Sequence, residues 1–467
     1  MSKLINKNIK AYYLLFSPIL INFIFNLINK DISLFGYNYL NLISTIFLFL
    51  FLFSIGRWID HTINLGSISL GIIVYFFSFY LIDIIILFFN QTLDFGEIFI
   101  ITNILWALFL AAKGRNMISL VLTALSYVSL NLFNKVYFYK FDINTQLIDD
   151  VAAVHFPQAK NIYENSYYFS INNPIFEGYP QFLSYISSLM YKISFNFETY
   201  DFLPPTVNVF YFLSILFFFE LNINIKLRNL LILVFTILIL NSPWLQFLFF
   251  NSLMGEACGS YFFVVILYNL FRYKENKIIS NNLIFFLFGM LFFTKQFFST
   301  LVIILSFLLI FNKDIRKYAL FGFSGILLRK IKYKFIFPNL NEDHHLDQID
   351  LLDTVKDLLT FSDLKLTNIV KISKNFFIDK PTSYIFLLLF FIILFSIYKK
   401  VNFSFEVSIY LFTIFANSML VFLLYISAWK NMELESPVRF LLNLLHLVLV
   451  TIFILLEQNN KQDIDTY

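Results

Sequence analysis

Two adjacent carboxylates, Asp149 and Asp150, are the clearest candidates for chemistry in this chain. They lie at about residues 135–201, in the longest polar stretch of the sequence, and His155 and Pro157 follow closely. A carboxylate can act as a general base that removes a proton from an acceptor hydroxyl or amine. An aspartate at this place can equally cap the helix that is predicted to follow it. Taken alone, the residues leave both interpretations open.

The elements that position this stretch are predicted from the composition. Of the 467 residues, 59% are hydrophobic and 14% are charged, whereas soluble domains carry about 25% charged residues. The single cysteine, Cys258, excludes a disulfide framework and a thiolate metal cluster. A spanning helix needs about 20 mainly apolar residues, and the chain offers many such windows. We therefore predict an all-α fold, a polytopic transmembrane helical bundle.

About fourteen apolar segments, within a range of 12–14, are predicted to cross the membrane. They lie at about 11–29, 39–56, 67–90, 97–112, 116–134, 203–224, 229–246, 253–271, 281–294, 297–311, 318–333, 383–398, 404–428 and 438–456. Two larger polar loops, at about 135–201 and 334–382, separate groups of these segments.

The basic residues between the segments predict the orientation of the chain. Lys3, Lys7 and Lys10 precede the first segment, and basic residues recur after most even-numbered segments. Short cytoplasmic loops are enriched in Lys and Arg. We therefore expect a bacterial inner (plasma) membrane protein with both termini in the cytoplasm. The two larger loops then lie on the outer, extracytoplasmic face.

The stretch Asp150–Glu164 resembles the first outer loop of the GT-C membrane glycosyltransferases. Those enzymes show an acid, often beside a second one, followed roughly by D-x-x-x-(Y)-H-x-P and A-x-x-I-x-E. Gly178–Pro180 stands where the family has paired prolines or Gly-x-Pro before an interfacial helix. The chain departs from the family at Val154, where an aromatic residue is usual. It also has about four additional spans before the helix that normally opens the fold.

The resemblance implies both a domain division and a reaction. Residues 116–467 would form the GT-C-like catalytic domain, and residues 1–115 would add N-terminal transmembrane helices. The superfamily includes the protein O-mannosyltransferases, the aminoarabinose transferases and the oligosaccharyltransferases. Its loop acid is the catalytic or acceptor-binding carboxylate, and its sugar donor is a polyprenyl phosphate or diphosphate. Asp150 is favoured for that role because of its spacing to His155, with Asp149 as the alternative.

Glu256 is the predicted second acid of the site. It lies near the outer end of a predicted span, where an ionisable group suggests function. Family members often carry an acid at a comparable place, although a hydrogen-bonded structural carboxylate is the alternative. Glu256 would assist directly or through a divalent cation, Mg²⁺ or Mn²⁺. His344 and His345, with Glu342, Asp343 and Asp347, form a separate candidate metal cluster. A solvated acidic loop explains this group as well, and adjacent histidines rarely bind one ion together, so no metal ligands are assigned.

Cations at two other outer turns are predicted to hold the donor phosphate. Lys295 follows Thr294, like the T-K pair of the family, although a surface lysine reaching to the interface explains it equally. Arg439 is suited to bidentate phosphate contact. It also lies four residues after Glu435 and can form an ion pair with it instead. Glu435 and the loop residue His155 complete the predicted substrate-binding residues.

The predicted function is therefore transfer of a sugar from a polyprenyl-phosphate-linked donor to an envelope acceptor at the outer face. The acceptor can be a lipid, a glycan or a protein, and membrane lipids are further expected partners. No nucleic-acid partner is expected. The alternative is a transporter or flippase for lipid-linked glycans. That function predicts charges at mid-membrane depth, whereas the charges here gather at the outer ends of segments.

Overall fold

The computed structural model describes residues 39–89, 95–112, 206–242, 255–276, 281–291, 380–427 and 443–465, with a few isolated positions between them. This part of the chain is all helical, so the predicted all-α class is confirmed for it. The helices are α2 (Tyr39–Ile63), α3 (Ile68–Phe88), α4 (Phe95–Ala112), α9 (Thr206–Glu220), α10 (Ile225–Asn241), α12 (Gly255–Asn276), α13 (Asn281–Met290), α18 (Lys380–Tyr398), α19 (Phe405–Ser427) and α21 (Leu445–Asp465).

Each of these helices coincides with a predicted apolar segment. The bounds agree to within about five residues except at two helices: α2 continues to Ile63 instead of ending near 56, and α21 lies at Leu445–Asp465 instead of about 438–456. The added turns of α21 are polar, and two of their side chains form hydrogen bonds with residues outside this helix. Gln458 donates to Ser404 Oγ at 3.1 Å, and Asn459 donates to Ser396 Oγ of α18 at 2.8 Å. The segments at 11–29 and 116–134 lie outside the described residues. So do about half of the segment at 297–311, nearly all of the segment at 318–333, and all but a few positions of the two larger loops.

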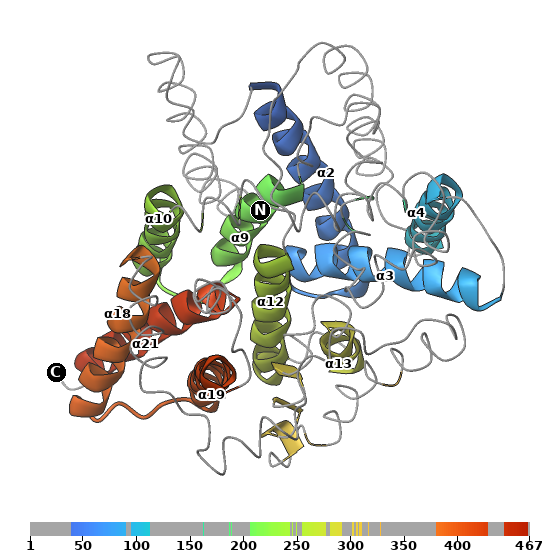
Figure 1. Ribbon diagram of the computed structural model, residues 1–467. Helices are drawn as coiled ribbons and strands as arrows, with labels where there is room; N and C mark the ends of the chain where they lie inside the picture. Colours follow the sequence, from blue (N-terminus) through green and yellow to red (C-terminus); the bar gives the residue numbers. More distant parts are fainter. Residues whose placement is uncertain are drawn as a thin grey trace.

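The directions of the helices differ widely (Figure 1). In that view α2 and α12 run up the page, α3 and α21 lie across it, and α19 is seen nearly end-on. No single described helix combines the length and the apolar character needed to cross a bilayer. One bent pair passes the same test together, Leu52–Ile63 with Ile68–Ile82, at an angle of 96°. The membrane-spanning bundle and its span count stay a prediction.

The turn between α2 and α3 is built from left-handed backbone and an aspartate. Asn64 has φ 51° and Gly66 has φ 69°, a region that Gly and Asn adopt with little strain. Asp60 holds both ends of the turn. Its backbone oxygen accepts from Leu65 N at 3.2 Å, and its Oδ1 accepts from Ser67 N at 3.1 Å. The chain therefore turns by about a right angle within a few residues, and the two helices pack on each other beside the turn.

Two glycines allow a close approach of α2 and α3. A Cβ atom added to Gly56 would lie 2.6 Å from the backbone oxygen of Ile68. A Cβ atom added to Gly71 would overlap the backbone of Gly56. Backbone therefore lies against backbone at Gly71, whereas at Gly56 the Ile72 side chain also fills the space, with Cγ1 2.5 Å from the added Cβ.

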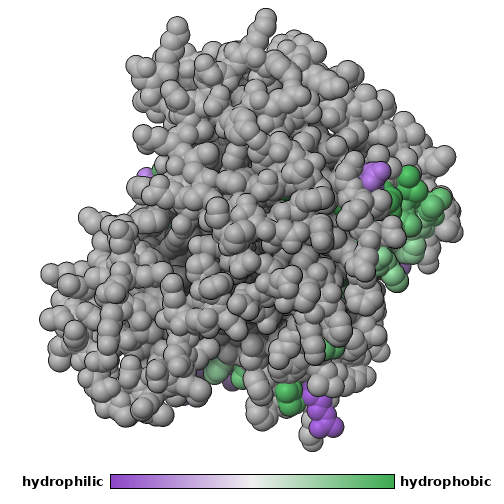
Figure 2. Space-filling view, turned by 45° about the vertical axis from the view of Figure 1, so that its right-hand side comes forward, coloured by the Kyte–Doolittle hydropathy of each residue, from purple (hydrophilic) through white to green (hydrophobic). Residues whose placement is uncertain are grey.

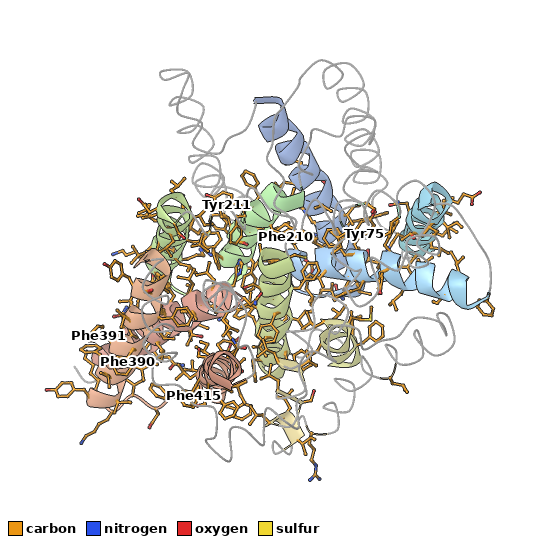
Figure 3. All side chains as sticks on the ribbon, in the orientation of Figure 1. Tyr75, Phe210, Tyr211, Phe390, Phe391 and Phe415 are labelled. Carbon is orange, nitrogen blue, oxygen red and sulfur yellow. The ribbon has the colours of Figure 1, made fainter. Side chains whose placement is uncertain are left out.

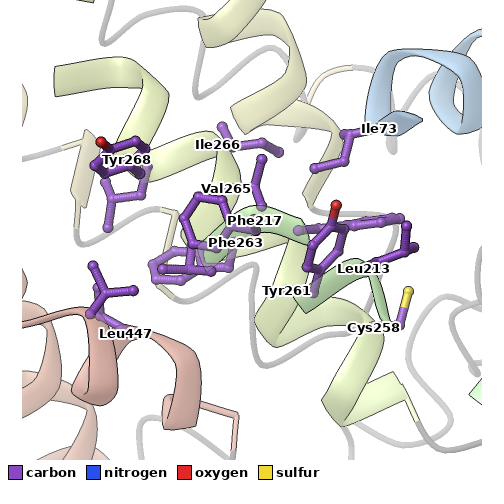
Figure 4. Packing of buried hydrophobic residues seen from close by; sticks show 14 of the residues in the cluster. Ile73, Leu213, Phe217, Cys258, Tyr261, Phe263, Val265, Ile266, Tyr268 and Leu447 are labelled. Carbon is purple, nitrogen blue, oxygen red and sulfur yellow. The ribbon is translucent and has the colours of Figure 1, made fainter. Parts of the chain in front are cut away.

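Helix α12 is the most enclosed element of the described fold. Seven consecutive residues, from Tyr261 to Leu267, have no exposed surface. A helix that is apolar and buried all round lies in the core. Phe262 packs against rings from α3 and α9, with centroids 5.7 Å from Phe77 and 5.9 Å from Phe210. Figure 4 shows other buried residues of α12, among them Tyr261, Phe263 and Val265, close to Leu213 and Phe217 of α9.

The peripheral helices expose apolar side chains instead. On α4, Ile104, Leu105, Leu108 and Phe109 are all exposed, with Leu108 at 62%. Figure 2 shows a hydrophobic patch at this side of the molecule. Exposed apolar side chains also occur on α10, α18 and α19. The described fold is thus apolar both in its core and on much of its outer surface.

Candidate functional site

One of the seven predicted site residues belongs to a described helix. Glu256 is the second residue of α12, which begins at Gly255. The other predicted site residues lie outside the described residues: Asp149, Asp150, His155, Lys295, Glu435 and Arg439. Their proposed gathering around one cavity stays a prediction.

A buried histidine connects α12 to two other helices. His446, at the start of α21, lies 2.7 Å through Nε2 from Ser214 Oγ of α9. Its other ring nitrogen, Nδ1, lies 2.7 Å from Ser260 Oγ of α12. All three side chains are buried. One imidazole therefore connects three helices that are far apart in the sequence.

The hydrogen bonds around Ser214 indicate the tautomer of this histidine. Ser214 Oγ lies 2.6 Å from the backbone oxygen of Phe210 and donates its single proton there. It can then only accept from His446, so Nε2 carries the proton. A neutral imidazole has one donor and one acceptor nitrogen, so Nδ1 accepts from the Ser260 hydroxyl. The protons of Ser214 Oγ, His446 Nε2 and Ser260 Oγ therefore each have one assigned acceptor.

Aromatic rings enclose the imidazole. Its centroid is 5.6 Å from that of Phe235, 5.9 Å from Phe249 and 6.1 Å from Phe218. A serine hydroxyl bonded to an imidazole is the pairing used in nucleophilic catalysis. Here the third group is Ser214 and not a carboxylate, and none of the three polar side chains reaches the surface. The geometry is that of a structural connection between helices.

A second polar contact involves Glu220, the last residue of α9. Its carboxylate accepts from the backbone amides of Ile68 at 2.7 Å and Ser69 at 3.0 Å. The Ser67 hydroxyl donates to it at 2.7 Å. These donors form the first turn of α3, where amides lack partners within the helix and negative charge is favourable. Glu220 therefore caps α3 from a different helix.

Both contacts involve side chains of α9. Ser214 and Glu220 are six residues apart on α9, an axial distance of about 9 Å. Tyr261 of α12 follows Ser260 directly, and its ring centroid lies 6.5 Å from that of His446. Figure 4 shows its hydroxyl turned towards α3. That hydroxyl is buried and has no hydrogen-bond partner among the described residues.

The described residues contain no group of three or more His, Cys, Asp or Glu side chains that could hold a metal ion. Cys258 is a buried free thiol within α12. The divalent cation that was considered beside Glu256 stays a prediction.

Neither Glu220 nor His446 was singled out from the sequence. Both carried a usable signal, because each is an ionisable residue within or at the end of an apolar run, FYFLSILFFFE and LLNLLHLVLV. Such residues are rare and deserve an assigned partner. The side-chain partners of Glu220 and His446 are serines, and serine is too common in this chain for its residue type to identify a partner.

Comparisons with known proteins give no relative for this chain. No protein-family model, curated protein or solved structure matches it. The resemblance to the GT-C enzymes therefore stays a prediction.

Proposed function

We propose that the chain is an integral membrane glycosyltransferase that uses a polyprenyl-phosphate-linked sugar and an acceptor of the cell envelope. The observation that carries this proposal is the acid pair Asp149–Asp150, followed by His155 and Pro157, in a long polar stretch of an apolar chain. A lipid-linked donor reaches a site at the membrane edge by lateral diffusion. Such an enzyme therefore needs no soluble nucleotide-binding domain.

The position of Glu256 supports the proposal. It lies in the first turn of α12, the helix with the most enclosed middle section. Ser260, one turn later, is bonded to His446, which also bonds α9. The helix that carries Glu256 is thus joined to two other helices one turn after this residue, which suits a side chain that has to be held in position.

In the proposed reaction, Asp150 or Asp149 removes the proton of the acceptor hydroxyl or amine as that group attacks the anomeric carbon. The bond from the anomeric carbon to the phosphate oxygen breaks, and the polyprenyl phosphate leaves with the electron pair. Lys295 and Arg439 stabilise the charge that develops on this leaving group. Glu256 orients the acceptor, or a cation that binds it.

A transporter of lipid-linked glycans predicts ionisable groups at mid-membrane depth that its cargo contacts. Glu220 and His446 are fully engaged by serines and backbone amides of the same chain.

Transfer of a radiolabelled sugar from polyprenyl phosphates by the purified protein tests the proposal. The double variant Asp149→Asn/Asp150→Asn should lose at least about a hundredfold in rate, because general-base catalysis contributes on the order of 10²–10⁴. Asp142→Asn, an acid of the same loop, is the matched control and should keep the wild-type rate. Unchanged transfer by the double variant would refute the assigned role of the loop.

A further inference from the structure

Helix α18 has an unusual distribution of polar and apolar side chains. Its large exposed side chains recur at Tyr384, Leu388, Phe391, Phe395 and Tyr398, with 59%, 62% and 84% of Tyr384, Phe391 and Tyr398 exposed. This spacing of three and four residues marks one face of a helix. Phe390, Leu394 and Ile397 widen the same exposed face. Figure 3 shows Phe390 and Phe391 at the periphery of the molecule.

The opposite face of α18 is buried and makes a polar contact with α21. Ile385, Leu389, Ile392 and Ser396 are buried, and α18 packs on α21. Asn459 of α21 donates to Ser396 Oγ at 2.8 Å. No Asp, Glu, Lys or Arg occurs between Tyr384 and Tyr398. The helix is therefore more polar inside than outside, the reverse of a helix at a water-exposed surface.

The end of α18 is basic and has a specific backbone geometry. Val401 N donates to Ser396 O, and Lys400 N donates to Ile397 O, each at 2.9 Å, which is the Schellman pattern. Lys400 occupies the left-handed position of this motif with φ 55°, a place where Gly is usual. Lys399 Nζ lies 4.9 Å from the ring centroid of Phe395, so the ammonium stays at the end of the apolar face. Lys400 is exposed.

We propose that the outer face of α18 contacts lipid acyl chains, and that Lys399 and Lys400 contact the phosphates of anionic headgroups at its end. Tyr384 and Tyr398 then lie towards the interfaces, where amphipathic rings concentrate. They are fourteen residues apart, about 21 Å along the helix, within a hydrocarbon core of about 30 Å. The proposal rests on the membrane location that the proposed function assumes, and it is independent of sugar transfer.

Spin labelling tests the apolar face. Full-length protein with Cys258→Ser and Phe391→Cys is labelled with a nitroxide and placed in vesicles of phosphatidylcholine and phosphatidylglycerol. Oxygen, which concentrates in the bilayer, should collide with this label more often than a water-soluble nickel chelate does. Lys226→Cys, at an exposed position before the apolar part of α10, is the control and should show the opposite preference. Preferential access of the chelate to position 391 would overturn the proposal in favour of water. Low access of both would overturn it in favour of cover by protein, either another segment or a second copy.

Lipid selectivity tests the basic end. The association of spin-labelled phosphatidylglycerol relative to phosphatidylcholine should fall about fivefold when Lys400→Gly removes one cation, given the usual attraction of a lysine near an anionic surface. Glycine suits the left-handed turn, so the helix end is retained. Lys400→Arg should keep the selectivity, and Lys461→Gln, which breaks a surface ion pair with Glu457, should not change it. Equal selectivity in Lys400→Gly and wild type would overturn the headgroup contact. Because neither measurement involves a sugar, absence of glycosyl transfer leaves both results interpretable.

Discussion

Replacement of Ser260 by alanine tests whether the buried histidine contact holds the helices together. In the structure the Ser260 hydroxyl donates to His446 Nδ1 at 2.7 Å. The substitution leaves the cage of rings around His446 intact and removes one donor. Since the Nε2 side of the ring is bonded to Ser214, the imidazole cannot turn to find another partner without losing that bond.

The expected loss of stability depends on His446 Nδ1, which has no hydrogen-bond donor after the substitution. Hydrogen bonds between helices in membrane proteins average about 0.6 kcal/mol. A buried acceptor without a partner costs more, about 1–3 kcal/mol. The second figure applies here because the rings of Phe218, Phe235 and Phe249 surround the imidazole and offer no donor. We expect Ser260→Ala to lower the free energy of unfolding by about 1–2 kcal/mol.

The assay is reversible unfolding of the purified protein in mixed micelles with increasing dodecyl sulfate, followed by circular dichroism. Ser306→Ala is the matched control, because Ser306 is equally buried and its hydroxyl has no hydrogen-bond partner among the described residues. Its substitution should change stability by less than about 0.5 kcal/mol.

A double-mutant cycle completes the test. With His446→Leu no acceptor is left for the Ser260 hydroxyl to satisfy, so Ser260→Ala should cost almost nothing in that background. The coupling free energy should equal about 1–2 kcal/mol. Additive effects, or equal stability of the Ser260→Ala and Ser306→Ala proteins, would refute the contact.

Three further substitutions probe other contacts by the same unfolding assay. Glu220→Ala removes the acceptor of the Ile68 and Ser69 amides and of the Ser67 hydroxyl, and should cost about 1–3 kcal/mol; an unchanged stability would exclude the cap. Gly71→Ala should cost about 1–3 kcal/mol or more, because the new methyl group overlaps the backbone of Gly56; a neutral result would mean that α2 and α3 separate freely. Gly66→Ala should cost about 1–2 kcal/mol through left-handed backbone strain alone, and a loss above that of Gly71→Ala would contradict this ranking.

The secondary structure was the most predictable part of the protein. Long apolar runs with charged residues at their ends give a signal that does not depend on distant contacts, so the bounds of α3 and α18 agree closely with the predicted segments. The end of α21 was less predictable, because Gln458 and Asn459 continue the helix through bonds to Ser404 and Ser396. Polarity marks where an apolar run ends, and it does not mark where the helix ends.

The arrangement of the helices could not be predicted in the same way. The 96° bend between the α2 and α3 segments needs Gly56 and Gly71 to meet, and glycines in a helical run give no indication of what they approach. The polar contacts in the core also depend on distant partners. Hydropathy averages over an apolar window hide a single His446, and no local pattern pairs it with Ser214 or Ser260. Six of the seven predicted site residues lie outside the described residues, so the proposed site is still a hypothesis from the sequence.

The contact between the two glycines has a mechanical consequence. The α2 and α3 backbones meet at Gly56 and Gly71, so the two helices cannot slide or roll over each other there without a clash. Glu220, at the end of α9, accepts a hydrogen bond from the first turn of α3, and Ser214 of α9 is hydrogen-bonded to His446 of α21. A displacement of α21 therefore either breaks these hydrogen bonds or moves α9, α3 and α2 with it.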